Sequence, residues 1–200
     1  MTVIGITGPT GAGKTTALRQ LEKMGALIID CDAVYHGLLE RDMQLRSALE
    51  ARFGALTGPD GGFDRKKLGK QVFQDPKALE ELNDIVRPYI ARAVERLLEQ
   101  SRQEGRAAAA VDGITIIESG LAARCDTTVA VLAPAEERVR RICAREGISE
   151  QYAKARVSAQ KQDGYFRANC DHILMNDCAD EQEFAERAQV LFQQLLNGIS

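Results

Sequence analysis

The 200-residue chain has no long apolar stretch, no basic leader and no large excess of either charge. No run approaches the ~20 apolar residues of a membrane-spanning helix, so we expect no membrane partner. No positively charged segment precedes the first apolar residues, which argues against a secretory signal. The formal net charge is only −3. We therefore expect no nucleic-acid partner, and an anionic ligand must be bound by a local arrangement of residues.

The sequence also lacks the cysteine spacings that metal sites use. Its five cysteines form no C-x-x-C motif. The neighbouring Cys170 and His172 supply too few ligands for a structural zinc site. Reduced thiols in a cytoplasmic protein are the better interpretation. Internal repeats and low-complexity tracts are absent, and a hydrophobic content of 44% is sufficient for one α/β core with an insertion.

The chain is organised around residues 2–16, which read TVIGITGPTGAGKTT. An apolar, β-branched run at residues 3–6 predicts a buried strand. Residues 8–15 follow at once and fit the pattern G-x-x-x-x-G-K-[ST] at every defined position. Helical periodicity begins directly afterwards, at residues 16–24. A strand, a glycine-rich loop and a helix in this order predict a phosphate-binding loop.

The residue types in this loop match the chemistry of phosphate binding. Glycines allow turns in which consecutive N–H groups point at a phosphate, and the helix beginning near Gly13 adds a positive dipole end. Lys14 can reach the β- and γ-phosphates of a nucleotide, and the Thr15 hydroxyl can bind Mg²⁺. The alternative is a glycine-rich turn that binds nothing. A dinucleotide fingerprint is excluded, because no third glycine follows Gly13 at the required spacing.

Acidic residues end two further predicted strands. Residues 26–29 predict a second strand, which Asp30 and Asp32 follow. Residues 107–111 predict a third strand, which ends in Asp112. Strands of a parallel sheet end on one rim, where ligands bind. Asp32 is therefore a candidate for contact with an acceptor, and Asp112 for water-mediated contact with Mg²⁺. The alternative for all three acids is a role in turn formation or in solvation of a strand end.

Residues 33–103 show helical periods and no clear strand, so we expect an all-helical insertion suited to a second substrate. Two of its prolines, Pro76 and Pro88, suit first helical positions. A glycine- and proline-rich turn is predicted over residues 58–62. The predicted helices cover residues 33–39, 43–53, 64–73, 76–86 and 88–103.

The C-terminal part of the chain returns to alternating strands and helices and carries a local excess of positive charge. Strands are predicted at 127–133 and 172–176, and Asp180 is expected to cap a final amphipathic helix. Between Arg138 and Arg167 there are eight Lys or Arg residues and three acids. Such a segment could close over a triphosphate and stabilise its charge. The alternative is a solvated helix face, the usual fate of a charge run.

Six segments, in this order, carry a more specific resemblance: ITGPTGAGKTT, GALIIDCDAV, DGGFDRKKLGKQVF, IESGLAARCD, REGIS and AQKQDGYFRANCDHILMN. With these segments the chain resembles the dephospho-coenzyme A kinase family over nearly its whole length. The phosphate loop alone would indicate only a phosphate-binding ATPase or kinase. The ordered set is much more specific.

The resemblance implies an α/β fold of the P-loop kinase type, with three layers around a five-stranded parallel sheet of order 2-3-1-4-5. The nucleotide-binding core would comprise residues 1–32, 104–145 and 169–200. A helical acceptor (CoA) domain would cover 33–103, and a lid 146–168. The implied reaction transfers the γ-phosphate of ATP to the ribose 3′-hydroxyl of dephospho-CoA, the last step of coenzyme A synthesis. ATP and dephospho-CoA would be the partners of a cytoplasmic monomer or weak oligomer.

The resemblance and the loop chemistry together assign roles to residues. Lys14, Asp32 and Arg145 are the expected catalytic residues. Asp32 would accept the proton of the ribose hydroxyl, and Arg145 would bridge phosphates from the base of the lid. Thr15 and Asp112 are the expected Mg²⁺ ligands. The expected ATP-binding residues are Gly11, Ala12, Gly13, Lys14, Thr15, Thr16, Gln160, Arg167 and Asn176.

Two segments depart from the family pattern. Arg87-Pro88 stands where a His-Pro pair is usual, and residues 114–117 read ITII where Pro-Leu-Leu-Phe usually precedes the glutamate. Both departures concern acceptor contacts and not phosphoryl transfer. A kinase of another nucleotide or small alcohol is therefore an alternative function. A regulatory nucleotide switch is a second alternative, against which the acid at position 32 argues, since it indicates an acceptor hydroxyl.

Overall fold

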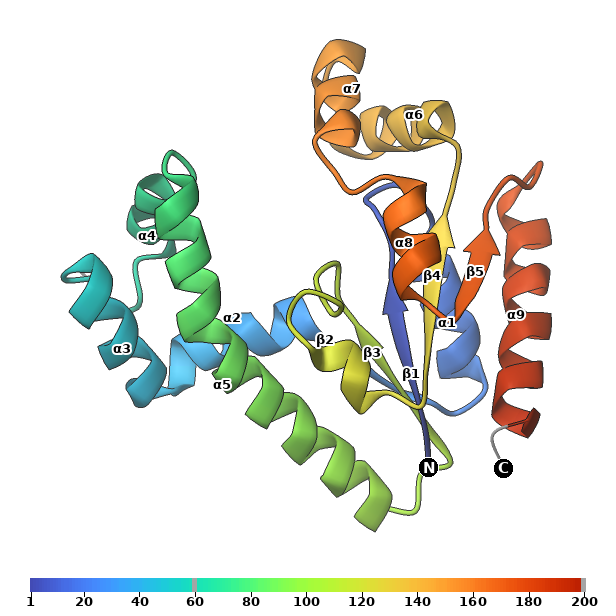
Figure 1. Ribbon diagram of the computed structural model, residues 1–200, viewed down its shortest axis with the longest axis horizontal. Coiled ribbons are helices and arrows are strands. Elements are labelled where there is room, and N and C mark those ends of the chain that lie inside the picture. Colours follow the sequence, from blue (N-terminus) through green and yellow to red (C-terminus); the bar gives the residue numbers. More distant parts are fainter. Residues whose placement is uncertain (59–60, 199–200) are drawn as a thin grey trace. The chain divides into compact units, whose positions relative to one another are not determined.

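A computed structural model describes residues 1–58 and 61–198 of the chain. Its centre is a five-stranded parallel sheet of order β2-β3-β1-β4-β5 (Figure 1). This order confirms the predicted fold class. The strands are β1 (Thr2–Thr7), β2 (Leu27–Asp30), β3 (Ala108–Asp112), β4 (Thr127–Leu132) and β5 (His172–Met175).

The central strand β1 leads directly into the phosphate loop. Its residues are buried on both faces from Val3 onward, as expected for a parallel strand covered by helices. In register, Ile6 lies opposite Asp112 of β3, and Thr7 lies opposite Ala130 of β4. The ends of the neighbouring strands therefore lie level with the start of the loop.

The structure divides into two compact units, and the first contains the sheet. It comprises Met1–Ile29 and Gln100–Ser200. Its largest apolar core joins strands β1, β3, β4 and β5 to the two packed helices α1 and α9, through residues such as Ile4, Leu21 and Phe192. Its helices are α1 (Lys14–Lys23), the 3₁₀ helix η1 (Leu121–Arg124), α6 (Ala135–Glu146), α7 (Glu150–Ser158), α8 (Asp163–Asn169) and α9 (Glu181–Gly198).

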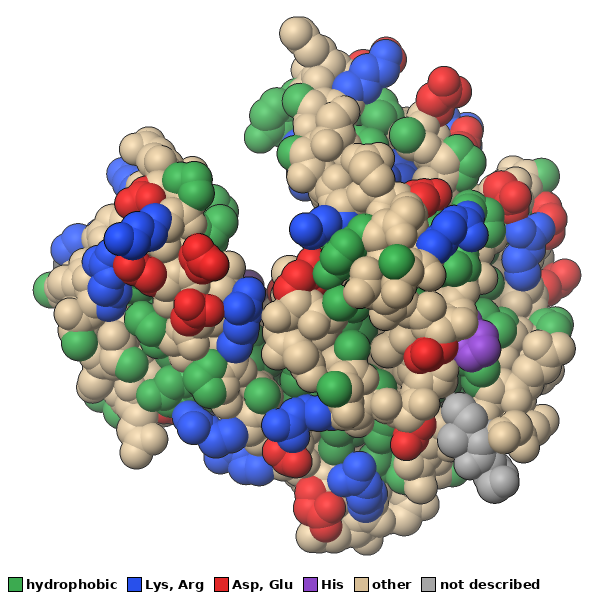
Figure 2. All heavy atoms as spheres, viewed as in Figure 1, with side chains coloured by type: hydrophobic (Ala, Val, Ile, Leu, Met, Phe, Trp, Pro, Cys, Tyr) green, Lys and Arg blue, Asp and Glu red, His purple; other side chains and the backbone are tan. Residues whose placement is uncertain are grey.

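The second unit, Asp30–Glu99, is helical and has an apolar core of its own. It contains α2 (Cys31–Arg41), α3 (Met43–Phe53), α4 (Arg65–Val72) and most of α5 (Pro76–Gln103). The predicted turn at 58–62 lies partly outside the described residues. On the face that Figure 2 shows, acidic and basic side chains are interspersed, in keeping with the small net charge. No described helix combines the length and hydropathy of a bilayer-spanning segment.

The largest error in the predicted boundaries is at Pro88, which does not begin a new helix. It lies inside the continuous helix α5. A proline there costs the helix one N–H bond and strains the preceding turn. Val86 before it and Ala93 after it both pack into the core of the second unit. Burial on both sides of the proline outweighs the local cost and keeps the helix unbroken.

Candidate active site

The phosphate loop is shaped by glycines in conformations that other residues rarely adopt. Gly13, the residue before α1, has φ 108°. A Cβ placed there would lie 2.4 Å from the Asn176 amide nitrogen. Gly8 has φ 136°, and a Cβ there would lie 2.1 Å from the Val131 carbonyl oxygen. The loop therefore needs glycine at both positions, and α1 starts at Lys14 with its first N–H groups facing outward from the helix.

The loop borders a pocket that contains most of the predicted phosphate-binding residues and three arginines. Lys14 lies at the start of α1, and its Nζ donates to the Gly8 carbonyl at 3.1 Å. A positive side chain at the N-terminal end of a helix adds to the helix dipole, and both favour an anion. The pocket is lined by Pro9, Thr10, Gly11, Ala12, Gly13, Lys14, Thr15, Ile114, Arg141, Arg145 and Arg156.

Asn176 supports the loop by hydrogen bonding to its backbone. Its side chain is buried, and its Nδ2 donates to the Ala12 carbonyl at 2.8 Å. Its Oδ1 accepts from Arg141 Nη2 at 3.2 Å. Arg141 Nη1 also lies 3.3 Å from the Gly11 carbonyl. Thus the predicted residue Asn176 does meet the loop, through hydrogen bonds that fix its backbone.

A second pocket lies on the other side of the first turn of α1. Thr16 lines it, and its hydroxyl donates to Glu181 Oε1 at 3.0 Å. Arg141 lines both pockets, and Asn176 lines this one. Its further lining residues are Gly13, Arg140, Cys178, Ala179, Asp180, Glu181 and Phe184.

Two arginines of the phosphate pocket share one carboxylate. Arg145, near the end of α6, donates to Glu146 Oε1, and Arg156 of α7 donates to Glu146 Oε2. These hydrogen bonds hold the pKa of Glu146 below its usual value. Apolar packing of α7 on α6, through Ile142 and Ala153 among others, supports the arrangement. The two guanidinium groups thereby stay beside the loop.

Arg138 and Gln160 contact the loop at Thr10. Arg138 is 2% exposed, and its Nε donates to the Thr10 carbonyl at 3.0 Å. Gln160, between α7 and α8, bonds to the Thr10 backbone and hydroxyl. Burial lowers the pKa of Arg138. Neither residue lines the two pockets beside the loop. Arg167 is exposed on α8, and it also lines neither pocket.

The two acids after β2 differ in their contacts. Asp30 caps α2, since its Oδ1 accepts from the backbone N–H groups of Asp32 and Ala33 at 2.8 and 3.1 Å. Asp30 therefore has a local structural role, as the alternative from the sequence suggested: it caps the helix that follows the strand. Asp32 is exposed in the first turn of α2. The helix begins at Cys31, two residues earlier than predicted, because the Asp30 cap starts it.

Asp112 ends β3 as predicted, one strand away from the loop. It stands opposite Ile6 in register, and the next residue, Gly113, donates its N–H to the Ile6 carbonyl at 3.2 Å. Thr15, the other predicted Mg²⁺ ligand, is exposed in the phosphate pocket. Among the described residues no group of three or more His, Cys, Asp or Glu forms a metal site.

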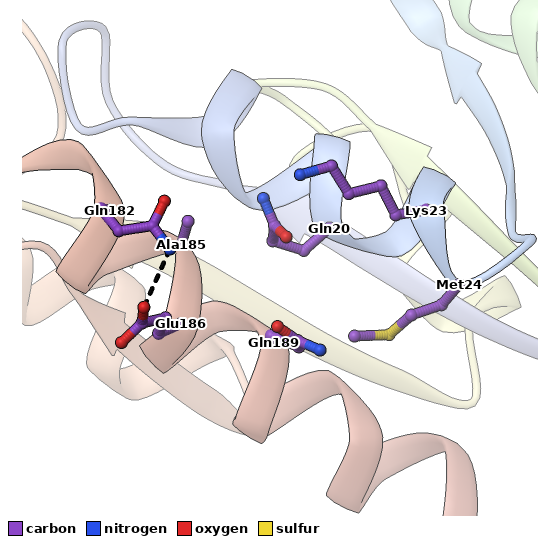
Figure 3. Close-up of a pocket in the computed structure, with 7 residues that line it drawn as sticks. All are labelled: Gln20, Lys23, Met24, Gln182, Ala185, Glu186 and Gln189. Atoms are coloured by element: carbon purple, nitrogen blue, oxygen red, sulfur yellow. Dashed lines mark hydrogen bonds between the residues drawn. The ribbon is translucent and has the colours of Figure 1, made fainter.

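A further pocket lies between α1 and α9, away from the loop (Figure 3). Its lining residues are Gln20, Lys23, Met24, Gln182, Ala185, Glu186 and Gln189. Gln182 donates to Glu186 within α9 at 2.8 Å. The lining comes from α1 and α9 and includes neither the phosphate loop nor the first turn of α1. It therefore lacks the group of backbone N–H donors that distinguishes the phosphate pocket.

Sequence reasoning grouped the arginines as one basic segment but did not separate their roles. Arg138, Arg141 and Arg145 recur every three or four residues, which places them on one face of α6. This spacing could have predicted that the three face the loop. Arg140 lies off this face and pairs with Glu137 as an exposed surface residue. Glu146 accepts hydrogen bonds from Arg145 and Arg156. In the sequence it was counted only as one of three acids in the basic segment.

A phosphate loop after the central strand of a parallel sheet ordered 2-3-1-4-5 defines a P-loop kinase. A sequence profile described as dephospho-CoA kinase matches residues 2–182. The chain belongs to the dephospho-CoA kinase family. It is thus a kinase of the last step of CoA biosynthesis, the ATP-dependent phosphorylation of dephospho-CoA.

Individual relatives agree with this assignment. A dephospho-CoA kinase of Dehalococcoides mccartyi is 35% identical over 182 residues, which cover 90% of this chain and 91% of that protein. A crystal structure from Thermus thermophilus is 31% identical, with a TM-score of 0.77 and coverage of 100% of this chain and 98% of that one. A dephospho-CoA kinase from Campylobacter jejuni, 22% identical, has the same fold, with a TM-score of 0.73 and coverage of 99% and 98%.

Proposed function

We propose that the phosphate pocket binds the triphosphate of ATP and that Lys14 stabilises the phosphoryl group in transfer. The observation that carries this proposal is the convergence of the α1 N-terminus, Lys14 and three arginines on one pocket. Phosphoryl transfer depends mainly on positioning and on neutralising charge that spreads over the equatorial oxygens. Gly11–Thr16 would hold the phosphates by backbone N–H groups. Arg145 would bridge them from α6.

The second pocket is our candidate for the adenosine end of the nucleotide. It adjoins the loop through Gly13 and Asn176, and Phe184 supplies an apolar surface there. Among the residues assigned by resemblance, Gly13, Thr16 and Asn176 line this pocket. Arg167 lines neither, so its proposed contact with ATP would require α8 or the nucleotide to move.

On the acceptor side, Asp32 is the proposed general base. It would orient the ribose 3′-hydroxyl of dephospho-CoA and take its proton as the hydroxyl oxygen attacks the γ-phosphorus. The bond from that phosphorus to the β,γ-bridging oxygen would break, and ADP would leave. The carboxylate is exposed, and its neighbour Asp30 fixes the backbone beneath it by capping α2. A positioned base of this kind contributes about 10²–10⁴-fold to the rate.

Thr15 and Asp112 fit the chemistry of Mg²⁺, which prefers hydroxyl, carboxylate, water and phosphate oxygens. Mg²⁺ uses few protein ligands in kinases, because substrate phosphates and waters complete its octahedron. We propose that Thr15 holds Mg²⁺ directly and Asp112 through water. The bound ion would neutralise charge on the β- and γ-phosphates.

We also propose a setting for the enzyme. ATP and dephospho-CoA would be its small-molecule partners in the cytoplasm, as a monomer or weak oligomer, with no nucleic-acid or membrane partner. Cys125, Cys143, Cys170 and Cys178 are free thiols, as is usual in a reducing compartment. We propose that residues 146–168 act as a lid. The apolar cluster between α6 and α7 and the bonds of Glu146 are the contacts that such a lid would use.

The experiment that tests this function measures ADP release with dephospho-CoA, with other nucleosides and with no acceptor. We expect release with dephospho-CoA to exceed the other two by orders of magnitude, and NMR of the product should show a 3′-phosphate. Equal release with another alcohol would assign a different acceptor. Release that does not depend on an acceptor would indicate an ATPase or a switch.

A further inference from the structure

Thr10, inside the phosphate loop, is bonded through its backbone and its hydroxyl to two residues far along the chain. Its N–H donates to Gln160 Oε1 at 3.2 Å, and its hydroxyl oxygen accepts from Gln160 Nε2 at 2.9 Å. Its carbonyl accepts from Arg138 Nε at 3.0 Å. Arg138 Nη2 also donates to Gln160 Oε1. Three residues thus form a closed ring of four hydrogen bonds, which we call the Thr10 ring.

The Gln160 side chain is largely committed to this ring. An amide oxygen has two lone pairs, and Gln160 Oε1 accepts two N–H donors, one from Thr10 and one from Arg138. Both donors require an oxygen at this position, which fixes the orientation of the amide. Gln160 lines neither pocket beside the loop. Its contacts therefore point to support of the loop and not to the nucleotide.

Arg138 is the charged support of the ring. It is almost completely buried, and among the described residues no carboxylate lies within ion-pair distance of it. A buried guanidinium is costly unless its N–H groups are bonded. The Thr10 carbonyl and the Gln160 amide satisfy these groups here. Its positive charge lies directly behind a loop whose other side forms the phosphate pocket.

We propose that Gln160 is a positioning residue of the phosphate loop, which fixes Thr10 with Arg138 behind it and acts on ATP only through Thr10. Preorganised N–H donors bind anions well because they need no rearrangement on binding. Gln160 lies in the connection between α7 and α8. A displacement of the Gln160 side chain is thereby passed to the loop. The inference rests on the proposed function, since ATP is taken as the ligand of the loop.

A double-mutant cycle tests the proposal by calorimetric titration of each variant with Mg-ATP, without acceptor. The variants are Thr10→Val, Gln160→Leu and the double substitution. The Thr10 hydroxyl has Gln160 as its partner, so its removal should add nothing once Gln160 is gone. We expect the Kd for ATP to rise about threefold in Thr10→Val and about tenfold in Gln160→Leu. The double variant should again show about tenfold.

Gln162→Leu is the matched control, because it makes the same change two residues further along the same connection. Gln162 is exposed, and within the described part of the chain its side chain donates to the Gln160 carbonyl alone, at 3.0 Å. Its Kd for ATP should stay within twofold of wild type. In turnover assays, Gln160→Leu should raise the KM for ATP and leave the KM for dephospho-CoA unchanged. A purely structural role would lower the melting temperature and leave both KM values in place.

The proposal is overturned if the double variant weakens ATP binding by the product of the single effects, about thirtyfold, because Gln160 would then act on ATP independently of Thr10. An unchanged Kd in Gln160→Leu overturns it too. If Gln160→Leu does not fold, Thr10→Ser and Thr10→Val decide: only the valine variant should weaken binding, and equal affinities contradict the ring. Wild-type protein that binds ATP but does not phosphorylate dephospho-CoA would refute the acceptor assignment and leave the ring intact.

Discussion

The two compact units use their polar side chains over very different distances along the chain. In the first unit, the Arg138–Thr10 bond spans 128 residues and the Asn176–Ala12 bond spans 164. In the second unit, Asp30 and Asp42 cap helices two or three residues away. The long bonds fix a loop whose conformation depends on the whole fold. The short ones begin helices whose burial comes from apolar packing.

Because of this difference, we expect mutations in the two units to affect function and stability separately. A change at the phosphate loop should alter chemistry or nucleotide binding with little loss of fold, because the loop lies at the edge of a well-packed core. A change at a helix cap of the second unit should alter stability first. Point mutations in the two units therefore test that separation.

Lys14→Ala should lower kcat about a thousandfold or more, because the ammonium neutralises charge that grows in the transition state. Alanine is a good residue for the first turn of α1, so the fold should persist. Circular dichroism and steady-state turnover measure the two effects. Normal turnover by a folded variant would refute the phosphate-loop assignment.

Asp32 and Asp30 offer a matched pair two residues apart. Asp32→Asn removes a base with little change in size, so kcat should fall about 10²–10⁴-fold while the Kd for ATP stays unchanged. Asp30→Ala removes the cap of α2 and should cost about 1 kcal/mol of stability with a small effect on kcat. Turnover, ATP titration and thermal melting of both variants separate the roles. Lower stability with normal kcat in Asp32→Asn would make it a second structural residue.

Residues 146–168 should respond to ligand if they form a lid. We expect ATP with acceptor to slow amide hydrogen exchange in α7 by about tenfold or more, because closure removes local opening. Phe192 and Leu195 of α9, which are buried in the first unit's core, serve as the internal reference for exchange unrelated to the lid. Identical exchange in α7 with and without both ligands would contradict the lid.

The smallest effect concerns Glu146 and pH. Because its pKa is lowered in the folded state by Arg145 and Arg156, its contribution to stability is present above the unfolded value near 4.5 and is lost as the pH falls through the folded pKa. The melting-temperature difference between wild type and Glu146→Gln should therefore be larger at pH 7 than at pH 3.5. Glu22→Gln, an exposed change on α1, is the control. A difference independent of pH would contradict the coupling.

Much of the fold followed from local pattern. The five strands, the loop and the bounds of α3 were predicted from apolar periodicity and glycine placement, which depend on nearby residues alone. Pro88 was misread for the same reason. A proline is a strong local signal for a helix start, whereas the continuity of α5 depends on core contacts on both sides of it.

The site was less predictable than the fold. The loop motif identified Lys14 and Thr15 directly, because their spacing is fixed by the phosphates they serve. The arginines of α6 looked alike in sequence, yet Arg138 is buried behind the loop, Arg141 bonds to it and Arg140 is a surface residue. The spacing of the arginines indicates which of them share a face of α6. It does not indicate what packs against that face, because the loop lies more than a hundred residues earlier in the chain.

By itself the sequence determined the fold class, the phosphate loop and the family, since each is encoded by short segments whose chemistry is local. Only the tertiary structure decided which polar side chains stabilise the loop and which face its pocket. Gln160 and Asn176 were expected to contact ATP, and the structure joins both to the loop backbone. Such pairings depend on how distant segments meet across a packed sheet, because a buried hydrogen bond needs its partner at a distance and angle that no local pattern specifies.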